Sequence, residues 1–174
     1  PVSCVQEVAT MHQEDVLTFH PLKEEDIEPL TRIMKRAFDE DTRIHLGRDS
    51  GGPPGYDNGE FLRKWGLHPR STAFRIQSGD RTVGAVIVWI NQKTGVNHLG
   101  NVFVEPVSQN RGMGLRIWTA VEAMFPDTRI WQTETPGFSR RNHHFYVNKC
   151  GFHVIRIENP KDPEESSFIL EKRM

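Results

Sequence analysis

The residues with the clearest chemical potential lie within positions 101–125. A short run of strand-forming residues, 102–104, is followed by a polar turn that contains Gly112 and Gly114 and leads into a strong helix. The first amides of a helix have no partner within it, and glycines let a phosphate come close to the backbone. Arg111 adds a positive charge to the turn. We therefore predict that this strand, turn and helix bind a phosphate group.

Two well-known phosphate motifs do not fit these glycines. The dinucleotide motif G-x-G-x-x-G requires a third glycine at position 117, where this chain has Ile117. A P-loop requires Lys followed by Ser or Thr after its last glycine, and this chain has Leu-Arg there. The remaining pattern is Q-x-x-G-x-G, formed by Gln109, Gly112 and Gly114.

The Q-x-x-G-x-G string after a strand resembles the pyrophosphate-binding motif of the GNAT superfamily of N-acetyltransferases, which use acetyl-CoA. The resemblance implies that the turn holds the pyrophosphate. It also implies that a bulge in the fourth strand supplies a backbone N–H to the thioester carbonyl. The residues that it implies for cofactor binding in this part of the chain are Val102, Phe103, Val104, Gln109, Asn110, Arg111, Gly112, Met113, Gly114 and Leu115.

A second motif, NHHFYVNKCGF at residues 142–152, strengthens the resemblance. Asn142 and Tyr146 are four residues apart and share one face of the expected helix. In the family the Asn helps to hold the CoA arm, and the Tyr lies near the thioester sulfur as general acid. The family places a glycine four residues after the Tyr, whereas Gly151 lies five residues after Tyr146, and counting back from it gives Val147. The asparagine spacing and the helix face favour Tyr146.

Acetyl transfer to an amine also needs the neutral form of that amine. A lysine-like amine with a pKa of about 10.4 is about 0.05% neutral near pH 7, which costs roughly 4–5 kcal/mol and favours a general base. His98 lies six residues before Val104, so side-chain alternation predicts that the two share a face. Its position resembles that of the catalytic glutamate of histone-acetylating members, whereas Glu134 resembles the base of members that acetylate N-terminal amines. Both residues remain candidates.

These side chains must be positioned by a sheet and its helices. Periodicity predicts strands at about 16–20, 73–77, 83–90, 96–104, 129–135, 152–157 and 168–170, and helices at about 24–38, 61–65, 114–125 and 139–149. This order fits an α/β (α+β) fold, with a mixed, mostly antiparallel central sheet of about seven strands and helices on both faces. It matches the GNAT fold, and we expect one domain over residues 16–174 after a flexible N-terminal arm at residues 1–15.

One segment interrupts this regular pattern. Residues 47–59 hold five glycines and two prolines in thirteen positions, which predicts a long loop. The loop is either a floppy surface insertion or a mobile lid over the substrate. The acidic residues 39–41 just before it either attract a cationic amine or form a solvated helix end.

Composition narrows the function classes. The chain has 174 residues and a net charge of −1 without a basic block, so we expect no nucleic acid ligand. The longest apolar run, 83–90, is too short for a membrane span of about 20 residues. Two cysteines, Cys4 and Cys150, are too few for a disulfide framework and favour a reducing cytoplasm. His143 and His144 point about 100° apart on a helix and chelate poorly, so we expect no metal.

Together these observations predict a cytoplasmic, acetyl-CoA-dependent N-acetyltransferase. It would transfer the acetyl group directly to a primary amine of a small molecule or peptide, because Cys150 precedes a helix-ending glycine and is better explained by packing than as a nucleophile. A non-catalytic acyl-CoA-binding sensor module is the main alternative, and a nucleotide-dependent enzyme is another. A homodimer is compatible with the sequence, which leaves the amine acceptor open.

Overall fold

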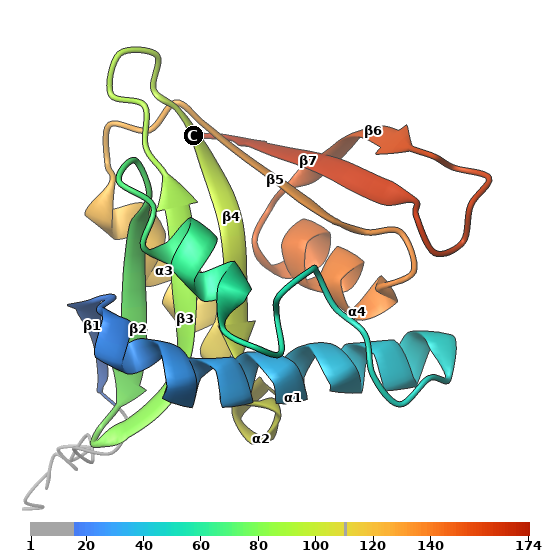
Figure 1. The fold of residues 1–174 in the computed structure, drawn as a ribbon. Helices are drawn as coiled ribbons and strands as arrows, with labels where there is room; N and C mark the ends of the chain where they lie inside the picture. Colours follow the sequence, from blue (N-terminus) through green and yellow to red (C-terminus); the bar gives the residue numbers. More distant parts are fainter. Residues whose placement is uncertain (1–15, 110) are drawn as a thin grey trace, which may run out of the picture.

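The computed structural model describes residues 16–109 and 111–174, so the predictions made for residues 1–15 and for Asn110 lie outside the described residues. Within these ranges, seven strands form one sheet in the order β1-β2-β3-β4-β5-β7-β6 (Figure 1). The strands are β1 (Leu17–Pro21), β2 (Thr72–Ser78), β3 (Arg81–Trp89), β4 (Val96–Val104), β5 (Ile130–Pro136), β6 (His153–Glu158) and β7 (Ser167–Arg173). Neighbouring strands are antiparallel except β4 and β5, which are parallel.

Helices cover both faces of this sheet. They are η2 (Glu24–Asp26), α1 (Ile27–Leu46), η3 (Leu62–Gly66), α2 (Pro106–Gln109), α3 (Met113–Met124), α4 (Arg140–His143) and η4 (His144–Lys149). One core cluster joins α1 and η3 to β3 and β4, and the other joins α3 and η4 to the opposite face of the sheet. The predicted mixed, mostly antiparallel sheet of about seven strands with helices on both faces is confirmed.

Helix α1 is longer than predicted. It continues to Leu46, so the expected end near Phe38 is wrong. Pro29 lies in its first turn, where the missing N–H of proline breaks no helical hydrogen bond. The helix ends at Gly47, whose φ of 67° is the left-handed conformation that favours glycine. The added turns carry Thr42, a buried residue that contacts the next segment, and tertiary contacts therefore extend the helix past its apolar pattern.

The glycine-rich segment 47–59 folds back onto α1. The Tyr56 hydroxyl donates a hydrogen bond of 2.6 Å to Asp39, and the amide of Gly51 donates to the same carboxylate oxygen at 3.2 Å. The Thr42 hydroxyl donates to the carbonyl of Gly51 at 3.0 Å. Burial, together with the Asp39 hydrogen bond, raises the pKa of Tyr56 to about 12. These hydrogen bonds hold the segment against α1, which does not fit a floppy insertion, and the lid stays a prediction.

The described part of the chain also bears on partners. No helix within residues 16–109 and 111–174 has the length and apolarity needed to cross a membrane. In the same residues, no group of three or more His, Cys, Asp or Glu side chains is arranged to hold a metal.

Cys150 is buried, and burial raises the pKa of its thiol to about 12. A thiol with so high a pKa is a poor nucleophile, which agrees with the packing role expected for Cys150.

Candidate active site

The site begins where β4 and β5 part. Their parallel pairing covers only residues 96–98 of β4 and 130–132 of β5, whereas β5 pairs with β7 along its whole length. Just beyond the last rung, the Thr133 hydroxyl donates to the Leu99 carbonyl at 2.9 Å. An opening therefore separates the second half of β4 from β5. This hydrogen bond lies at the narrow end of the opening, where the two strands begin to separate.

A bulge lies in β4 at the same level. Leu99 and Asn101 pair with adjacent residues of β3, so Gly100 between them is an extra residue. A Cβ on Gly100 would lie 2.7 Å from Nε1 of Trp89, which explains the glycine. The family resemblance implied a bulge in the fourth strand at residues 102–104, whereas the structure has the bulge at Gly100, just before them.

The bulge reverses the side-chain alternation along β4. Leu99 and Val104 are five residues apart, yet both belong to the core cluster beneath α3, while Phe103 belongs to the cluster beneath α1. His98, next to Leu99, therefore lies on the α1 face. The expectation that His98 and Val104 share a face is wrong, because it assumed a regular strand without the bulge.

His98 and Glu134 lie on the same face of the sheet. His98 is paired with Gln132 on the last rung between β4 and β5, and Glu134 follows Gln132 by two residues along β5. Burial lowers the pKa of His98, and the Glu134 carboxylate raises it in part. His98 is therefore neutral near pH 7 and within electrostatic reach of an exposed carboxylate.

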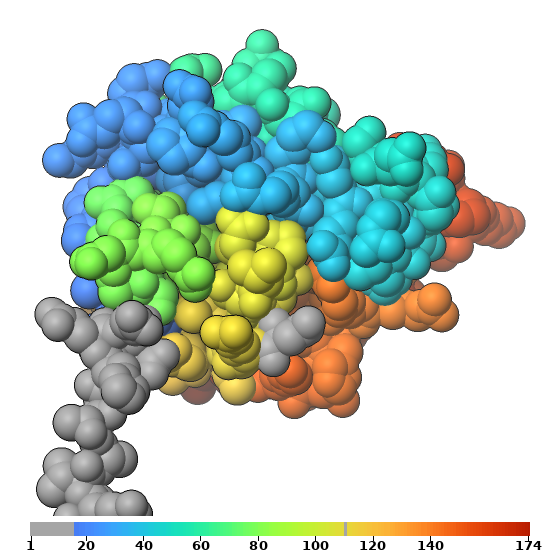
Figure 2. All heavy atoms as spheres, turned by 90° about the horizontal axis from the view of Figure 1, so that it is seen from below, coloured from blue at the N-terminus to red at the C-terminus, as the bar shows by residue number. Residues whose placement is uncertain are grey.

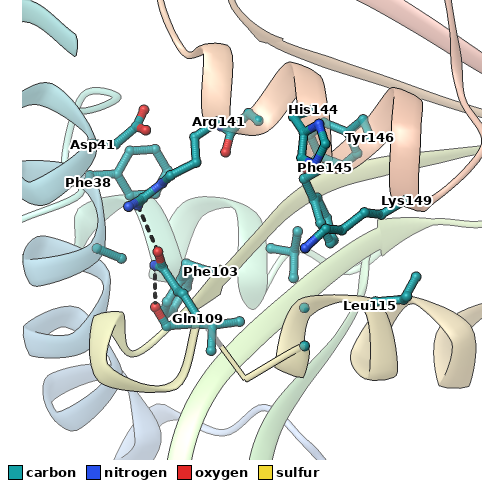
Figure 3. Close-up of a pocket in the computed structure, with 16 residues that line it drawn as sticks. Phe38, Asp41, Phe103, Gln109, Leu115, Arg141, His144, Phe145, Tyr146 and Lys149 are labelled. Atoms are coloured by element: carbon teal, nitrogen blue, oxygen red, sulfur yellow. Dashed lines mark hydrogen bonds between the residues drawn. The ribbon is translucent and has the colours of Figure 1, made fainter. Parts of the chain in front are cut away.

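Most of the predicted site residues meet in one cavity of about 220 Å³ (Figure 3). It is lined by Val102, Phe103, Val104, Gln109, Gly112, Gly114, Leu115, Asn142 and Tyr146. Arg111 is exposed outside it, and the side chain of Met113 is buried in the core instead. His98 and Glu134 do not line the cavity. Asn110 lies outside the described residues.

The cavity has further walls that the sequence did not predict. These residues are Ala37, Phe38 and Asp41 of α1 and Arg141, His144, Phe145 and Lys149 of α4 and η4. Seen from below, α1, the segment that contains α2 and the segment that contains α4 lie on one face of the molecule (Figure 2). Part of this wall could have been predicted from the sequence, because the spacing of one helical face is shared by Asn142, Phe145, Tyr146 and Lys149.

The part of the wall that α1 forms could not be predicted from local spacing, because α1 contacts a segment about a hundred residues away. The Asp41 carboxylate accepts a hydrogen bond of 3.0 Å from Ser139, the residue that caps α4. The Asn142 side chain donates to Thr135 of β5 at 3.1 Å. These contacts fix α4 between α1 and β5. The acidic residues at the end of α1 differ in role. Asp39 binds Tyr56 of the glycine-rich segment, whereas Asp41 lines the cavity.

The extra residue before Gly151 is absorbed by η4, a π-helical turn. Its wider hydrogen bond runs from the amide of Cys150 to the carbonyl of Phe145 at 3.0 Å, five residues back. Tyr146 therefore still reaches the cavity, and Val147 does not line it. Burial raises the pKa of Tyr146 well above its usual value, so its hydroxyl keeps its proton.

The two glycines of the turn have different roles. Gly112, which precedes α3, has a φ of 70°, and the space where a Cβ would point is open. A Cβ on Gly114 would lie 3.1 Å from the Phe145 ring, so this glycine allows α3 to pack closely against η4. An anion can thus approach the start of α3 beside Gly112, where helix amides lack partners within the helix. These features fit a phosphate-bearing ligand.

The peptide groups of β4 also face the opening. The amide of Glu105 donates to Val83 of β3, whereas the carbonyl of Val104 accepts from the Gln109 side chain at 2.9 Å. Because peptide groups in an antiparallel pair alternate in direction, those of Val102 and Val104 point away from β3, and that of Phe103 points toward it. The N–H groups of Val102 and Val104 are therefore aimed at the space that β5 has left.

Comparison with known proteins places this arrangement in context. Residues 30–152 match the family model described as Acetyltransferase (GNAT) family. Uncharacterized protein YrkN of Bacillus subtilis (strain 168) is 36% identical over 137 residues, which are 79% of this chain and 73% of that protein. The fold is similar to that of an acetyltransferase from Thermus thermophilus, with a TM-score of 0.73, 17% identity and coverage of 92% of this chain and 99% of the other.

A second solved structure has the same fold and a bound cofactor. PaiA N-acetyltransferase from Thermoplasma acidophilum, in complex with coenzyme A, has a TM-score of 0.69 and 15% identity, and the match covers 91% of this chain and 99% of that one. At this level of identity, the likeness concerns the fold alone.

Proposed function

This chain belongs to the GNAT acetyltransferase family, and from that premise we propose that it transfers an acetyl group from acetyl-CoA directly to a primary amine of a small molecule or peptide. One observation carries the proposal: the end of β4, the glycine turn and Tyr146 line a single cavity. Among the described residues, the second half of β4 has no partner strand on the β5 side, so an extended ligand can lie along it.

The cofactor would be held from two sides of this cavity. Acetyl-CoA, when bound, supplies a thioester whose acyl carbon is open to attack by an amine. The start of α3 beside Gly112 would hold the pyrophosphate through unpartnered helix amides. Gln109, Leu115 and Asn142 would line the path of the pantetheine arm, a role supported by their places in the cavity wall.

The β4 backbone would stabilise charge on the acyl oxygen. The N–H groups of Val102 and Val104 point into the opening and are fixed by the β3–β4 pairing. Donors that are held in place before the reaction stabilise developing charge without reorganisation, and one such donor is typically worth about 3–4 kcal/mol. We assign one of these two amides to the acyl oxygen.

The amine proton would leave on the α1 face. His98 is kept neutral by burial and lies on the last rung before the opening, and Glu134 lies on the same face just beyond it. We assign His98 as general base and Glu134 as the carboxylate that stabilises its protonated form. The N–C bond forms as the C–S bond breaks, and the amine proton passes to Nε2 or Nδ1 of His98.

Tyr146 would protonate the departing thiolate. Its high pKa keeps the hydroxyl protonated, and Tyr146 is one of the residues that line the cavity. A CoA-like thiol has a pKa of about 8.5, so the thiolate needs this proton only modestly. We therefore assign Tyr146 a smaller effect on rate than the base.

The proposal is tested by binding and by turnover. Acetyl-CoA should raise the thermal midpoint of the purified protein, and a panel of primary amines should release CoA in its presence. CoA should be detected by mass spectrometry, because thiol reagents also react with accessible cysteines of a protein and the chain contains two cysteines. Stabilisation without acetylation of any amine would favour the alternative of a non-catalytic acyl-CoA sensor. Tight ATP or NAD binding without acetyl-CoA binding would contradict the proposal.

Two further parts of the sequence-based prediction stay predictions. The homodimer can be checked by sedimentation at two protein concentrations. The cytoplasmic location rests on the low cysteine content and can be checked by fractionating cells that express the protein.

A further inference from the structure

We propose that Arg141 is an oxyanion-binding residue of the cavity, which exchanges its bond with Gln109 for a phosphate or carboxylate group of a bound substrate. The inference rests on the proposed function, since it concerns a ligand of the same cavity.

Arg141 is a partly buried cation that pairs with no carboxylate in the part of the chain that the structure describes. Among residues 16–109 and 111–174, two arginines are partly buried, Arg75 and Arg141. Arg75 forms an ion pair of 3.1 Å with Asp26. Within the same residues, no carboxylate lies within 4.0 Å of Arg141, and its side-chain partner is the neutral amide oxygen of Gln109 at 2.7 Å. Removing a guanidinium from water without a counter-ion is costly, so this site favours an anionic ligand.

The orientation of Arg141 makes it available to such a ligand. Figure 3 shows its side chain extending from α4 across the cavity to Gln109, close to Phe38. Asp41 lines the same cavity, but its carboxylate is bound to Ser139 and forms no ion pair with Arg141 among the described residues. Asp41 therefore does not neutralise Arg141 by direct contact.

The rest of the lining reinforces the preference for an anion. Lys149 also lines the cavity, and Figure 3 shows its ammonium group directed into it. Within the described residues, Lys149 forms no ion pair. Arg141 and Lys149 thus face one carboxylate, that of Asp41, and the cavity carries a positive balance. Such a balance attracts anions into a cavity that is partly shielded from water.

The Gln109 bond is suited to exchange. It is a single bond to a neutral acceptor, whereas a phosphate or carboxylate offers two charged oxygens to the guanidinium fork. Gln109 also donates to the Val104 carbonyl, so it keeps one partner when Arg141 leaves. The oxyanion has two sources, a phosphate group of acetyl-CoA or a carboxylate on the acceptor, and both would be bound by the same chemistry.

The test compares Arg141→Met with Arg140→Met, which removes the same charge from the neighbouring exposed residue. Titration calorimetry with acetyl-CoA and with acetyl-pantetheine, which lacks the phosphates of the nucleotide, separates the two sources. If the oxyanion belongs to the cofactor, R141M weakens acetyl-CoA binding about tenfold or more and leaves acetyl-pantetheine binding unchanged. If it belongs to the acceptor, acetyl-CoA binding is unchanged and KM rises only for amines that carry a carboxylate.

Two results would overturn the proposal. One is that R141M and R140M behave alike with both acyl donors and all acceptors. The other is that R141M lowers the thermal midpoint and weakens acetyl-CoA and acetyl-pantetheine equally, as expected if Arg141 only braces α4 against the turn. Arg141→Lys should recover part of the lost affinity, because it keeps the charge without the fork. If the wild-type protein binds acetyl-CoA but acetylates no amine, the proposed function fails, while the acetyl-CoA titrations still decide the role of Arg141.

Discussion

The hydroxyl of Thr133 and the carbonyl of Leu99 form a buried hydrogen bond of 2.9 Å at the point where β4 and β5 separate. Because β5 no longer pairs with β4 there, this side chain replaces a backbone donor for Leu99. The opening that receives the proposed cofactor can therefore start at Leu99 without leaving a buried carbonyl unpaired.

Thr133→Val should destabilise the protein by about 1–3 kcal/mol, because it leaves the Leu99 carbonyl buried without a donor. Urea unfolding measures this free energy. Thr133→Ser is the matched control, since it keeps the hydroxyl and should lose less. Equal stability of the two variants would show that the hydrogen bond does not support the narrow end of the opening.

Gly84→Ala should be more damaging. A Cβ at this position would lie 2.0 Å from the carbonyl oxygen of Phe103, a backbone atom of β4 that has little freedom to move. We expect a loss of about 3 kcal/mol or more in the free energy of unfolding, with reduced acetyl-CoA affinity because residues 102–104 must shift. Thermal unfolding and titration with acetyl-CoA would measure both effects. A variant with normal stability and affinity would contradict the tight β3–β4 packing.

Tyr146→Phe should lower kcat with little change in acetyl-CoA affinity. The general-acid contribution is typically about 10²–10⁴-fold, and we expect the lower end because the leaving thiol is itself acidic. Since burial raises the tyrosine pKa well above its usual value, the wild-type rate should show no fall from tyrosine ionisation up to about pH 10. Val147→Ala is the control from the neighbouring position. A larger kcat loss in V147A than in Y146F would reverse the assignment.

The pH dependence of kcat/KM should identify the base. Burial lowers the pKa of His98, so the active neutral form is lost only when the pH falls below about 6.5. His98→Gln should lower kcat/KM by about 10²-fold and remove this acidic limb. Glu134→Gln removes the charge that raises the His98 pKa, so the limb should move to lower pH while activity near neutrality is largely kept. The opposite pattern, with activity lost in E134Q and kept in H98Q, would assign the base to Glu134.

Tyr56→Phe should loosen the cover that segment 47–59 forms on α1. It removes the 2.6 Å hydrogen bond to Asp39, which is worth about 1–3 kcal/mol because the acceptor is charged. Faster proteolytic cleavage within residues 47–59, with unchanged acetyl-CoA affinity, is the expected result, since no residue of this segment lines the cavity. Reduced acetyl-CoA affinity in Y56F would instead indicate that the segment takes part in cofactor binding.

Much of the fold was predictable because its signals are local. The alternation and apolar runs of the strands, the turn glycines and the helical stripe before Phe125 each depend on neighbours within a few residues. The end of α1 was not predictable in this way. Its last turns are stabilised by Thr42 and Asp39, which bind the glycine-rich segment, and a helix propensity pattern contains no information about that partner.

The residues of the candidate site likewise fall into two groups, those that the sequence predicts and those that only tertiary packing brings together. The glycine turn, Asn142 and Tyr146 could be identified from the sequence, because each motif lies on one continuous element whose spacing sets which side chains share a face. Only the folded chain shows that the bulge at Gly100 moves His98 to the face opposite Val104, and that a π-helical turn keeps Tyr146 in the cavity despite the extra residue. Folding also brings Asp41 to Ser139 and Arg141 to Gln109. Such contacts depend on how distant segments pack, and local spacing does not encode them.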